Sequence, residues 1–517
     1  MNQNNISAAE LFLRVRELLI LPELEPKTRN KMMHDTLILC CHEGVKDTKQ
    51  AFGNLFSQVD YLCKAHGIKV ADKIAIQTMR RHSNSQEPLS SEDLKYDARA
   101  LAIFISAVFG VDVPHELNVL IPHTNRPYQK GLEINNRRIR CIVKNWDSDF
   151  IRVDIDQDAD EEEYLVQLKD EENHIDHTYL WDILKEGMQL NLLDCQVKQP
   201  VITPRLIVVE PDYLVDISSI ATCFTAFGHH PLLYLLNQMK PRANTQATLL
   251  GNFAGAALDD IINTNGKYQM NETIKTNFRE KALEFCTCPW FDAKKFYTDA
   301  NQQAFNLQQV VDILFPRTAS QAQMSAFRGE SLYDRKKAIL EPSFVCEALG
   351  IQGRVDLMTT DCKLLVEQKS GRNMNIETHQ VDPGYHSYQL EPHYVQLLLY
   401  YGVLQHNFKL SNDRVNIRLL YSKYQPQDGL MVVAYYHKLF QEAITYRNQL
   451  VAASFEIAKE GFEHALNEFT PDVLNVAGTQ DFFYNKYLKP QIEAITSPLH
   501  NLTPLEEAYF CRMMTFV

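Results

Sequence analysis

The chain has 517 residues, of which 45% are hydrophobic and 23% charged, and its formal net charge is −13. This length predicts roughly two to four domains of ordinary globular composition. The acidic balance argues against a protein that coats DNA with its whole surface, although a nuclease needs only a local basic track. Eleven scattered cysteines and the lack of a signal sequence predict a reducing, cytoplasmic location.

Residues 1–112 predict a helical region, because apolar residues recur at helical spacing over 8–21, 48–65 and 94–109. No catalytic pattern occurs there, so we interpret the region as a helical interaction or regulatory domain of open function. Residues 113–205 change to short alternating runs, which are typical of a small antiparallel β-barrel. Such a barrel can bind single strands through basic grooves and stacked aromatics, or can serve only as a spacer.

Two basic residues of the barrel region, Arg137 and Arg140, are candidates for contacting nucleic acid. They lie in a stretch that mixes basic and apolar residues, as a half-buried strand does. The acidic run over 154–163 is interpreted as an exposed loop, because it lacks the glycine and the terminal spacing of a calcium-binding loop.

Residues 206–470 predict an α/β domain with a mixed central sheet, flanking helices and a site at one edge. Strands are expected over 415–421 and 430–436, and a long helix over 438–467. The stretch 217–239 has no Asp, Glu, Lys or Arg and is long enough to cross a membrane. Its polar residues favour a buried segment of a globular domain instead.

The most informative motif is Gly353-Arg-Val-Asp356-Leu-Met, followed eleven residues after the Asp by Glu367-Gln-Lys369-Ser-Gly371. If both apolar runs are strands, Glu367 and Lys369 share one face because they are two residues apart. Two carboxylates can hold Mg²⁺, which acidifies a water and neutralises charge on a scissile phosphate. Lys369 can orient that water or stabilise the developing charge.

The spacing alone is common, and solvated charges on a surface hairpin would explain it equally well. The apolar run over 364–366 instead predicts that Glu367 ends a buried strand, where a charge needs a partner or a metal. Further along the chain, His393, Gln396 and Tyr400 fall at spacings of three and four, which is one face of a helix.

Together, Gly-Arg-Val-Asp, Glu-Gln-Lys-Ser-Gly and Gln-x-x-x-Tyr resemble the PD-(D/E)XK nuclease superfamily in its RecB-like branch. The likeness extends to the nuclease half of the replication and repair nuclease-helicases, which process Okazaki fragments and resect DNA ends. Segments over 206–215, 250–255 and 446–450 add to it, so that it covers roughly residues 200–517. In that family the region before the nuclease core holds an oligonucleotide-binding-like barrel.

The resemblance implies that Asp356 and Glu367 bind Mg²⁺ or Mn²⁺, that Lys369 is the catalytic lysine, and that Gln396 and Tyr400 orient single-stranded or flap DNA. The residues expected to contact DNA are Arg372, His393, Arg447, Arg137 and Arg140.

The chain departs from the family at the first nuclease helix, where Gly255 replaces a metal-binding histidine. The site then has one ligand fewer, or Asp259 or Asp260 one turn later compensates. The simpler interpretation of these two residues is a solvated helix face. Glu341 resembles a recurrent family glutamate, although an ordinary charge at a strand edge is an equal alternative.

An iron–sulfur cluster is not expected. Many relatives ligate one with a cysteine before the nuclease core and three after it. Here Cys223 could be the first, but only Cys511 follows Tyr400. Cys286 and Cys288 lack the spacing of a zinc site, so buried free thiols are the simplest interpretation.

Residues 471–517 predict a helical segment that begins with the cap Thr503-Pro-Leu-Glu506. In the resembling enzymes a helicase follows, so we interpret the segment as the truncated start of a helicase part, and a helicase domain or subunit as a partner. The chain has no Gly-x-x-x-x-Gly-Lys-Ser/Thr, so no P-loop ATPase is expected in it.

The favoured hypothesis is a metal-dependent nuclease for single-stranded or flap DNA in replication and repair. The first alternative is a catalytically degenerate nuclease fold that binds DNA or assembles a complex; Gly255 motivates it, and the intact Asp356, Glu367 and Lys369 set opposes it. The second is an RNA-processing or restriction-type nuclease with the same core.

Overall fold

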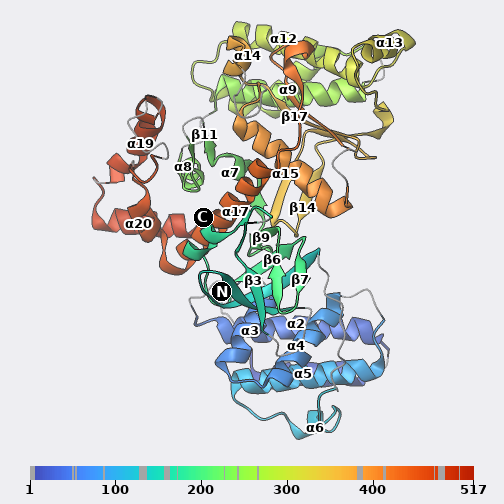
Figure 1. Cartoon of the computed structure of the whole chain (residues 1–517), viewed down its shortest axis with the longest axis vertical. Helices are drawn as coiled ribbons and strands as arrows, with labels where there is room; N and C mark the ends of the chain where they lie inside the picture. Colours follow the sequence, from blue (N-terminus) through green and yellow to red (C-terminus); the bar gives the residue numbers. More distant parts are fainter. Residues whose placement is uncertain are drawn as a thin grey trace. The chain divides into compact units, whose positions relative to one another are not determined.

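The computed structural model describes residues 6–21, 23–48, 52, 55–84, 88–126, 137–156, 163–171, 173–225, 228–240, 244–264, 267–380, 388–410, 415–470, 472–475, 482, 484–499 and 501–517. Its contacts divide the chain into two compact units. The first unit comprises Met1–Tyr213 and Ser454–Glu460, and the second comprises Leu214–Ala453 and Gly461–Val517. Both units contain sheets and helices, so the predicted mixed α/β class is confirmed (Figure 1).

The first unit begins with a bundle of helices around one apolar core. Helices α1 and α5 each begin with a capping box. The hydroxyl of Ser7 or Ser90 accepts a backbone N–H of the first turn, and the serine's own N–H donates to a carboxylate of that turn. The core also contains a buried hydrogen bond, in which Asn30 Nδ2 donates to Asp97 Oδ2 at 2.9 Å. The helices are α1 (Ala8–Ile20), α2 (Pro26–Val45), α3 (Leu55–Ala65), α4 (Val70–Asn84), α5 (Ser91–Phe109) and α6 (His115–Asn118).

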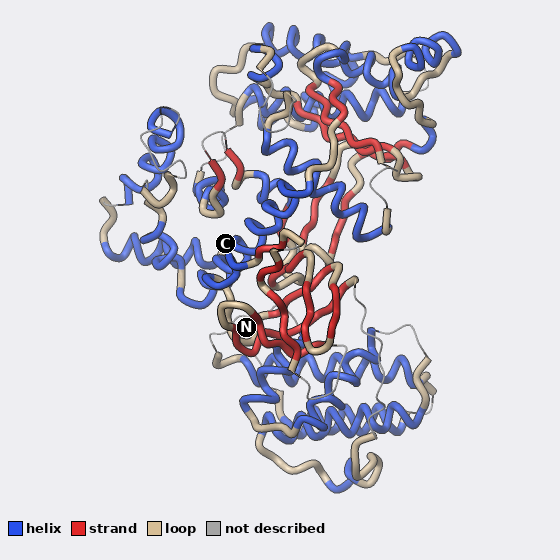
Figure 2. The backbone as a smooth tube through the Cα atoms, viewed as in Figure 1, coloured by secondary structure: helices blue, strands red, loops and turns tan. Residues whose placement is uncertain are grey.

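A sheet follows the bundle, and its strands are drawn in red in Figure 2. It has seven strands in the order β7-β8-β3-β2-β1-β6-β9. Alternate residues of β1 and β2 point into a shared core, and a bulge between Val143 and Asn145 shifts their register. The strands are β1 (Arg138–Trp146), β2 (Phe150–Ile155), β3 (Tyr164–Gln167), β6 (Gln189–Leu193), β7 (Gln196–Lys198), β8 (Val201–Thr203) and β9 (Leu206–Val209), and the small pair β4 (Lys169–Asp170) and β5 (Ile175–Asp176) lies apart.

The prediction of a small antiparallel barrel is wrong in two respects. The β7–β8 hairpin joins β3 through a parallel pairing, so the sheet is mixed. Strand β9 pairs with β6 at the opposite edge, and no ladder joins β9 to β7 among the described residues. The alternation of apolar residues predicted the strands and their buried face, but it cannot predict which edges meet.

The second unit is built on a five-stranded mixed sheet, β13-β16-β17-β18-β19. Helices α9 (Gln246–Asn263) and α12 (Ala293–Leu314) pack on one of its faces, where they share an apolar core with β16, β17 and β18. The strands are β13 (Ala338–Leu340), β16 (Leu357–Thr359), β17 (Leu364–Lys369), β18 (Asn416–Tyr421) and β19 (Leu430–Val432). The predicted mixed sheet is thus confirmed, with β17 and β18 as its parallel pair.

A bent hairpin connects this sheet to a second one, β10-β15-β14. Leu340 pairs with Leu357, and Ser343 pairs with Arg354, so both halves of the hairpin keep one register. The bend comes at Glu341, whose φ of 47° is unusual for a residue with a side chain and whose N–H donates to Asp356 O at 2.9 Å. The added strands are β10 (Val215–Asp216), β14 (Ser343–Cys346) and β15 (Ile351–Arg354).

Two long helices complete the second unit's core: α15 (Glu391–Phe408) and α17 (His437–Glu460). The predicted single helix over 438–467 is interrupted because Gly461, at a φ of 90°, cannot continue it. The remaining elements are α7 (Ile217–Ala221), β11 (Phe224–Thr225), β12 (Gly228–His229), α8 (Leu233–Met239), α10 (Met270–Glu280), α11 (Ala282–Cys286), α13 (Ala319–Phe327), α14 (Met374–Thr378), α16 (Pro426–Gly429), α18 (Phe462–Glu468), α19 (Lys489–Leu499) and α20 (Pro504–Phe516), with short 3₁₀ or π turns at Thr178–Asp182, Arg335–Lys337 and Tyr484–Leu488.

The uncharged stretch 217–239 folds as short elements rather than one helix: α7, β11, β12 and α8. Within the described ranges, no helix combines the length and the apolar character needed to cross a bilayer.

His229 of β12 links this stretch to both long helices. Its Nε2 lies 2.7 Å from Glu391 Oε2 of α15, and its Nδ1 lies 2.6 Å from Glu442 Oε1 of α17. Burial alone lowers the pKa of His229, but the hydrogen bonds and charges of the two glutamates outweigh burial and raise it to about 9. The imidazolium therefore ties α15 to α17.

We expect this link to make stability depend on pH. The folded pKa of about 9 exceeds the ordinary value of 6.5, so the contribution is complete below pH 6.5 and is lost as pH rises through 9. His229→Gln should lower the free energy of unfolding by about 2 kcal/mol near pH 6. Urea unfolding should show that deficit shrinking toward alkaline pH.

The exposed His66 supplies the control, since His66→Gln should change little at any pH. A deficit in His229→Gln that stays constant or grows as pH rises would contradict the charged-histidine link.

Candidate active site

Strand β17 presents Glu367 and Lys369 on one face, as the alternation predicted. Leu364 and Val366 point to the opposite face, into the core shared with α9 and α12. Lys369 Nζ donates to Glu367 Oε1 at 2.7 Å and to Gln396 Oε1 at 2.8 Å. Because Glu367 is only 3% exposed, this ammonium is the partner that its buried carboxylate requires.

Helix α15 supplies the residues that face this pair. Tyr400 Oη donates to Arg354 O at 2.6 Å, one turn along the helix from Gln396. Gly353 lets the Tyr400 ring approach the hairpin, since a Cβ at Gly353 would lie 3.0 Å from Tyr400 Cε1. The helix predicted to carry His393, Gln396 and Tyr400 is confirmed as α15, and Gln396 and Tyr400 both contact residues of the motif.

Asp356 joins the same cluster from the bend of the hairpin. Its Oδ2 accepts the Gln368 N–H of β17 at 2.5 Å. Burial raises the pKa of Asp356, whereas that N–H bond and the charge of Lys369 lower it. Burial, and then the charge of Asp356, raise the pKa of Glu367 to about 8, against the opposing effect of Lys369. The two carboxylates are therefore close enough to repel one another.

Two further carboxylates face this pair. Burial raises the pKa of Asp259 on α9 to about 7, and the charges of Glu341 and Asp356 add to the shift. Glu341 is exposed and pairs with Arg354 at 3.0 Å. The solvated-face interpretation fits the exposed Asp260 better than the half-buried Asp259. Clustered carboxyls with raised pKa values are typical of functional sites.

Gly255 lies one helical turn before Asp259. A Cβ built at Gly255 would have no neighbouring atom within 4 Å, so the helix face toward the acidic cluster has room for a larger side chain at this position. Gly251, one turn earlier, is tighter, because its Cβ would lie 3.2 Å from Ser370 Oγ.

The cluster fits an open site for a divalent cation. Glu367 Oε2 is buried and has no hydrogen-bond partner. Across the described ranges, no three His, Cys, Asp or Glu side chains are close enough to enclose a metal by themselves. Mg²⁺ does not need such a cage, since it binds through one or two carboxylates and takes its other oxygens from water and phosphates. Asp356 and Glu367 supply that donor set.

The residues predicted to contact DNA lie in different surroundings. His393 Nδ1 lies 3.0 Å from Tyr421 Oη, and burial, aided by the charge of Lys369, lowers its pKa to about 4, so it is neutral near pH 7. Arg447 is fully buried, and its Nε donates to Gly350 O at 3.1 Å. This side chain therefore supports the core and is not on a surface that DNA could contact.

Arg137 and Arg140 belong to the first unit. Both terminal nitrogens of Arg140 lie 2.9 Å from the carboxylate of Asp212, so this side chain is already engaged. Arg372 follows β17 in the second unit, where its guanidinium donates to Glu377.

A buried polar network that the sequence did not point to supports the end of β17. Gln303 of α12 donates to Ser370 O at 3.1 Å and accepts from Ser422 Oγ at 2.7 Å. Asn306, one turn later, donates to Ser422 O at 3.0 Å. The only signal for it was a pair of amide side chains on an otherwise apolar helix face. This network fixes the backbone beside Lys369.

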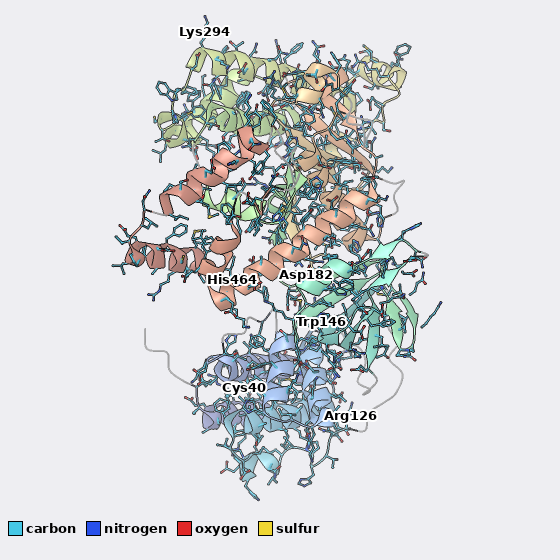
Figure 3. The ribbon with its side chains drawn as sticks, turned by 60° about the vertical axis from the view of Figure 1, so that its left-hand side comes forward. Cys40, Arg126, Trp146, Asp182, Lys294 and His464 are labelled. Carbon is cyan, nitrogen blue, oxygen red and sulfur yellow. The ribbon has the colours of Figure 1, made fainter. Side chains whose placement is uncertain are left out.

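All eleven cysteines carry free thiols. Cys40 lies within the helical bundle of the first unit (Figure 3), and its burial raises its pKa to about 12. Cys223 is likewise buried in the second unit, with its pKa raised to about 12 by burial. Such thiols are poor nucleophiles.

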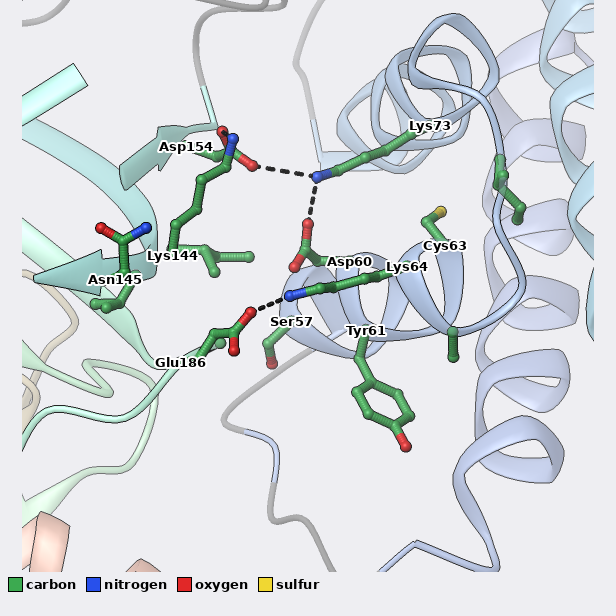
Figure 4. A pocket seen from close by; sticks show the side chains of 15 residues that line it. Ser57, Asp60, Tyr61, Cys63, Lys64, Lys73, Lys144, Asn145, Asp154 and Glu186 are labelled. Carbon is green, nitrogen blue, oxygen red and sulfur yellow. Dashed lines mark hydrogen bonds and ion pairs between the residues drawn. The ribbon is translucent and has the colours of Figure 1, made fainter. Parts of the chain in front are cut away.

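A cavity of about 580 Å³ lies in the first unit. Figure 4 shows Lys73 between Asp60 and Asp154 at its wall, and Asp154 also pairs with Lys144 at 2.6 Å. The two positive and two negative charges of this network cancel in sum, so this part of the wall carries no net charge.

No protein-family model and no curated protein sequence matches this chain.

We expect the close approach at Gly353 to contribute to stability. Gly353→Ala places a methyl group 3.0 Å from Tyr400 Cε1 and 3.3 Å from Ile217 Cβ, so the ring must shift. Overpacking of this kind should cost about 1–3 kcal/mol in urea unfolding. Gly371→Ala is the matched control in the same motif, because its Cβ meets nothing within 4 Å. Equal stability of the two variants would contradict the packing argument.

Proposed function

We propose that this chain is a Mg²⁺- or Mn²⁺-dependent nuclease that hydrolyses phosphodiester bonds in single-stranded or flap DNA. The observation that carries the proposal is the ammonium of Lys369, held between the buried carboxylate of Glu367 and the amide of Gln396. Asp356 is fastened to the same strand through the Gln368 N–H. The likeness of these motifs to RecB-like nucleases supports the same reaction.

Asp356 and Glu367 would hold the cation, which supplies an acidified water and neutralises charge on the scissile phosphate. Lys369 has three N–H donors, of which Glu367 and Gln396 engage two. The third can be directed to the attacking water or to a non-bridging phosphate oxygen. Because both partners fix the Nζ position, this donor is oriented before substrate binds, which lowers the barrier without reorganisation.

Tyr400 and Gln396 would position the substrate strand beside Lys369. Burial, and then the charge of Glu367, raise the pKa of Tyr400, so its hydroxyl stays protonated and keeps its hydrogen bond to Arg354 O at any physiological pH. Gln396 presents its amide NH₂ while its oxygen is engaged by Lys369.

Asp259 would take the role of the histidine that relatives carry at the position of Gly255. The carboxylate projects from the same helix face one turn later, and its pKa responds to Asp356 and Glu341. A carboxylate at this place adds negative charge to the site and favours hard cations such as Mg²⁺ and Mn²⁺.

The second candidate function is a DNA-binding or assembly module with a degenerate centre. Gly255 favours it, because a side chain that could ligate a metal is missing where there is room for one. The two candidates differ in one measurable property, metal-dependent cleavage.

We expect 5′-labelled single-stranded and flap DNA to be cut in Mg²⁺ or Mn²⁺ and left intact with chelator. Glu367→Ala and Lys369→Ala should each lower kcat by about 10²-fold or more. Lys275→Ala is the control, since Lys275 forms an exposed ion pair with Glu272 on α10. Binding without metal-dependent cleavage would favour the module, and cleavage of RNA alone would favour an RNA-processing enzyme.

A gain-of-ligand variant tests the role of the vacant helix position. Gly255→His should fold normally, because no atom lies within 4 Å of the new Cβ, and it should lower the Mn²⁺ concentration for half-maximal cleavage several-fold. Gly255→Ala controls for the gain in helix propensity. An unchanged Mn²⁺ dependence in Gly255→His would show that this helix face does not contribute to the metal site.

A further inference from the structure

Three hydrogen-bond donors converge on the carboxylate of Glu377. Tyr424 Oη lies 2.9 Å from Glu377 Oε1, and Lys423 Nζ lies 3.2 Å from the same oxygen. Arg372 Nε donates to the other oxygen, Oε2. Two cations and a phenol thus surround one carboxylate.

These donors lie beyond the same sheet edge as the candidate active site. Strands β17 and β18 are parallel, and Lys369 pairs with Tyr421 at their ends. Arg372 follows Lys369 by three residues, and Lys423 follows Tyr421 by two. Ligands of α/β sheets bind outside the carboxyl ends of the strands, so a strand of nucleic acid at Lys369 would pass these donors.

The chemistry of the cluster matches a phosphate group. Arginine and lysine pair with phosphate as they do with carboxylate, and a phenol can donate a further bond. Two positive charges face one negative charge here, so the cluster keeps a net charge of +1 on a chain whose net charge is −13. Arg372 is 62% exposed and Lys423 is 44% exposed, so both can reach a ligand from solvent.

Glu377 can leave the cluster without dismantling it. Exposed ion pairs contribute little to stability. Tyr424 Oη also accepts the Asn373 N–H at 2.8 Å, and the Asn373 side chain caps α14 independently of Glu377. The donors would therefore keep their places if the carboxylate swung away.

We propose that Arg372, Lys423 and Tyr424 bind a backbone phosphate of the substrate strand next to the scissile bond, and that Glu377 fills this phosphate site in the free protein. The proposal rests on the proposed nuclease function, because it places the substrate strand at Lys369. A purely structural role, in which the ion pairs only fasten α14 to the loop after β18, is the competing explanation.

Binding of a fluorescein-labelled single-stranded oligonucleotide, followed by anisotropy in EDTA over a range of salt concentrations, tests the proposal on the full-length chain. The double variant Arg372→Gln/Lys423→Gln should bind at least several-fold more weakly. Its plot of log affinity against log salt should flatten by about 0.7, since each phosphate of a single strand that the protein neutralises contributes about 0.7. Lys275→Gln, which breaks a comparable exposed ion pair, should leave both quantities unchanged.

Glu377→Gln gives the decisive result because it changes binding in the opposite direction. Removing the competing carboxylate should tighten binding several-fold, which misfolding cannot mimic. A structural role predicts instead a loss of stability with no gain in affinity, and that outcome would overturn the proposal, as would an unchanged salt dependence in the double variant.

The same proteins assayed for cleavage in Mg²⁺ separate this proposal from the nuclease function. Cleavage by the wild type with an unaltered KM in the double variant would refute the phosphate site alone. The expected pattern is a raised KM in the double variant, a lowered KM in Glu377→Gln, and a kcat close to wild type in both.

Discussion

The buried carboxylate of Glu367 is the constraint on which the candidate site depends. Taking an ionised group out of water is costly, so burial raises the pKa of Glu367 to about 8 although the charge of Lys369 opposes that shift. Lys369 supplies the opposite charge from the same strand, and Gln396 then fixes the ammonium from α15. This requirement brings the helix onto that face of β17. Asp356 is held to the adjacent peptide, so the hairpin, the strand and the helix meet at one point.

At this sheet edge a cluster of carboxylates is followed by two basic side chains, an arrangement that suits a polyanion bound together with a metal cation. Burial, and then the charge of neighbouring carboxylates including Asp356, raise the pKa values of Asp259 and Glu367. Without a counter-ion this group would also repel a phosphate. Arg372 and Lys423 place two positive charges just beyond it, and in the proposed nuclease these charges would attract the substrate strand.

Local patterns in the sequence were enough to predict the site's strand, its helix and its facing residues, because side-chain periodicity fixes which residues share a face. Helix α2 lies in the region predicted to be helical but was not singled out, because polar residues such as Asn30 and Thr36 interrupt its buried apolar face. The barrel prediction was wrong because strand pairing depends on distant edges. The place of Asp259 was also open, because only the fold decides which of two adjacent aspartates faces the hairpin.

The bend at Glu341 limits which insertions and deletions the hairpin can accept. The hairpin keeps one register on both sides of the bend, so Glu341 stands opposite Asp356 only while its two arms have equal length. Gaining or losing a single residue in either arm would turn Asp356 to the other side of the sheet, away from Glu367. A change of residue type in either arm leaves this register intact, whereas an unequal change in the length of the two arms does not.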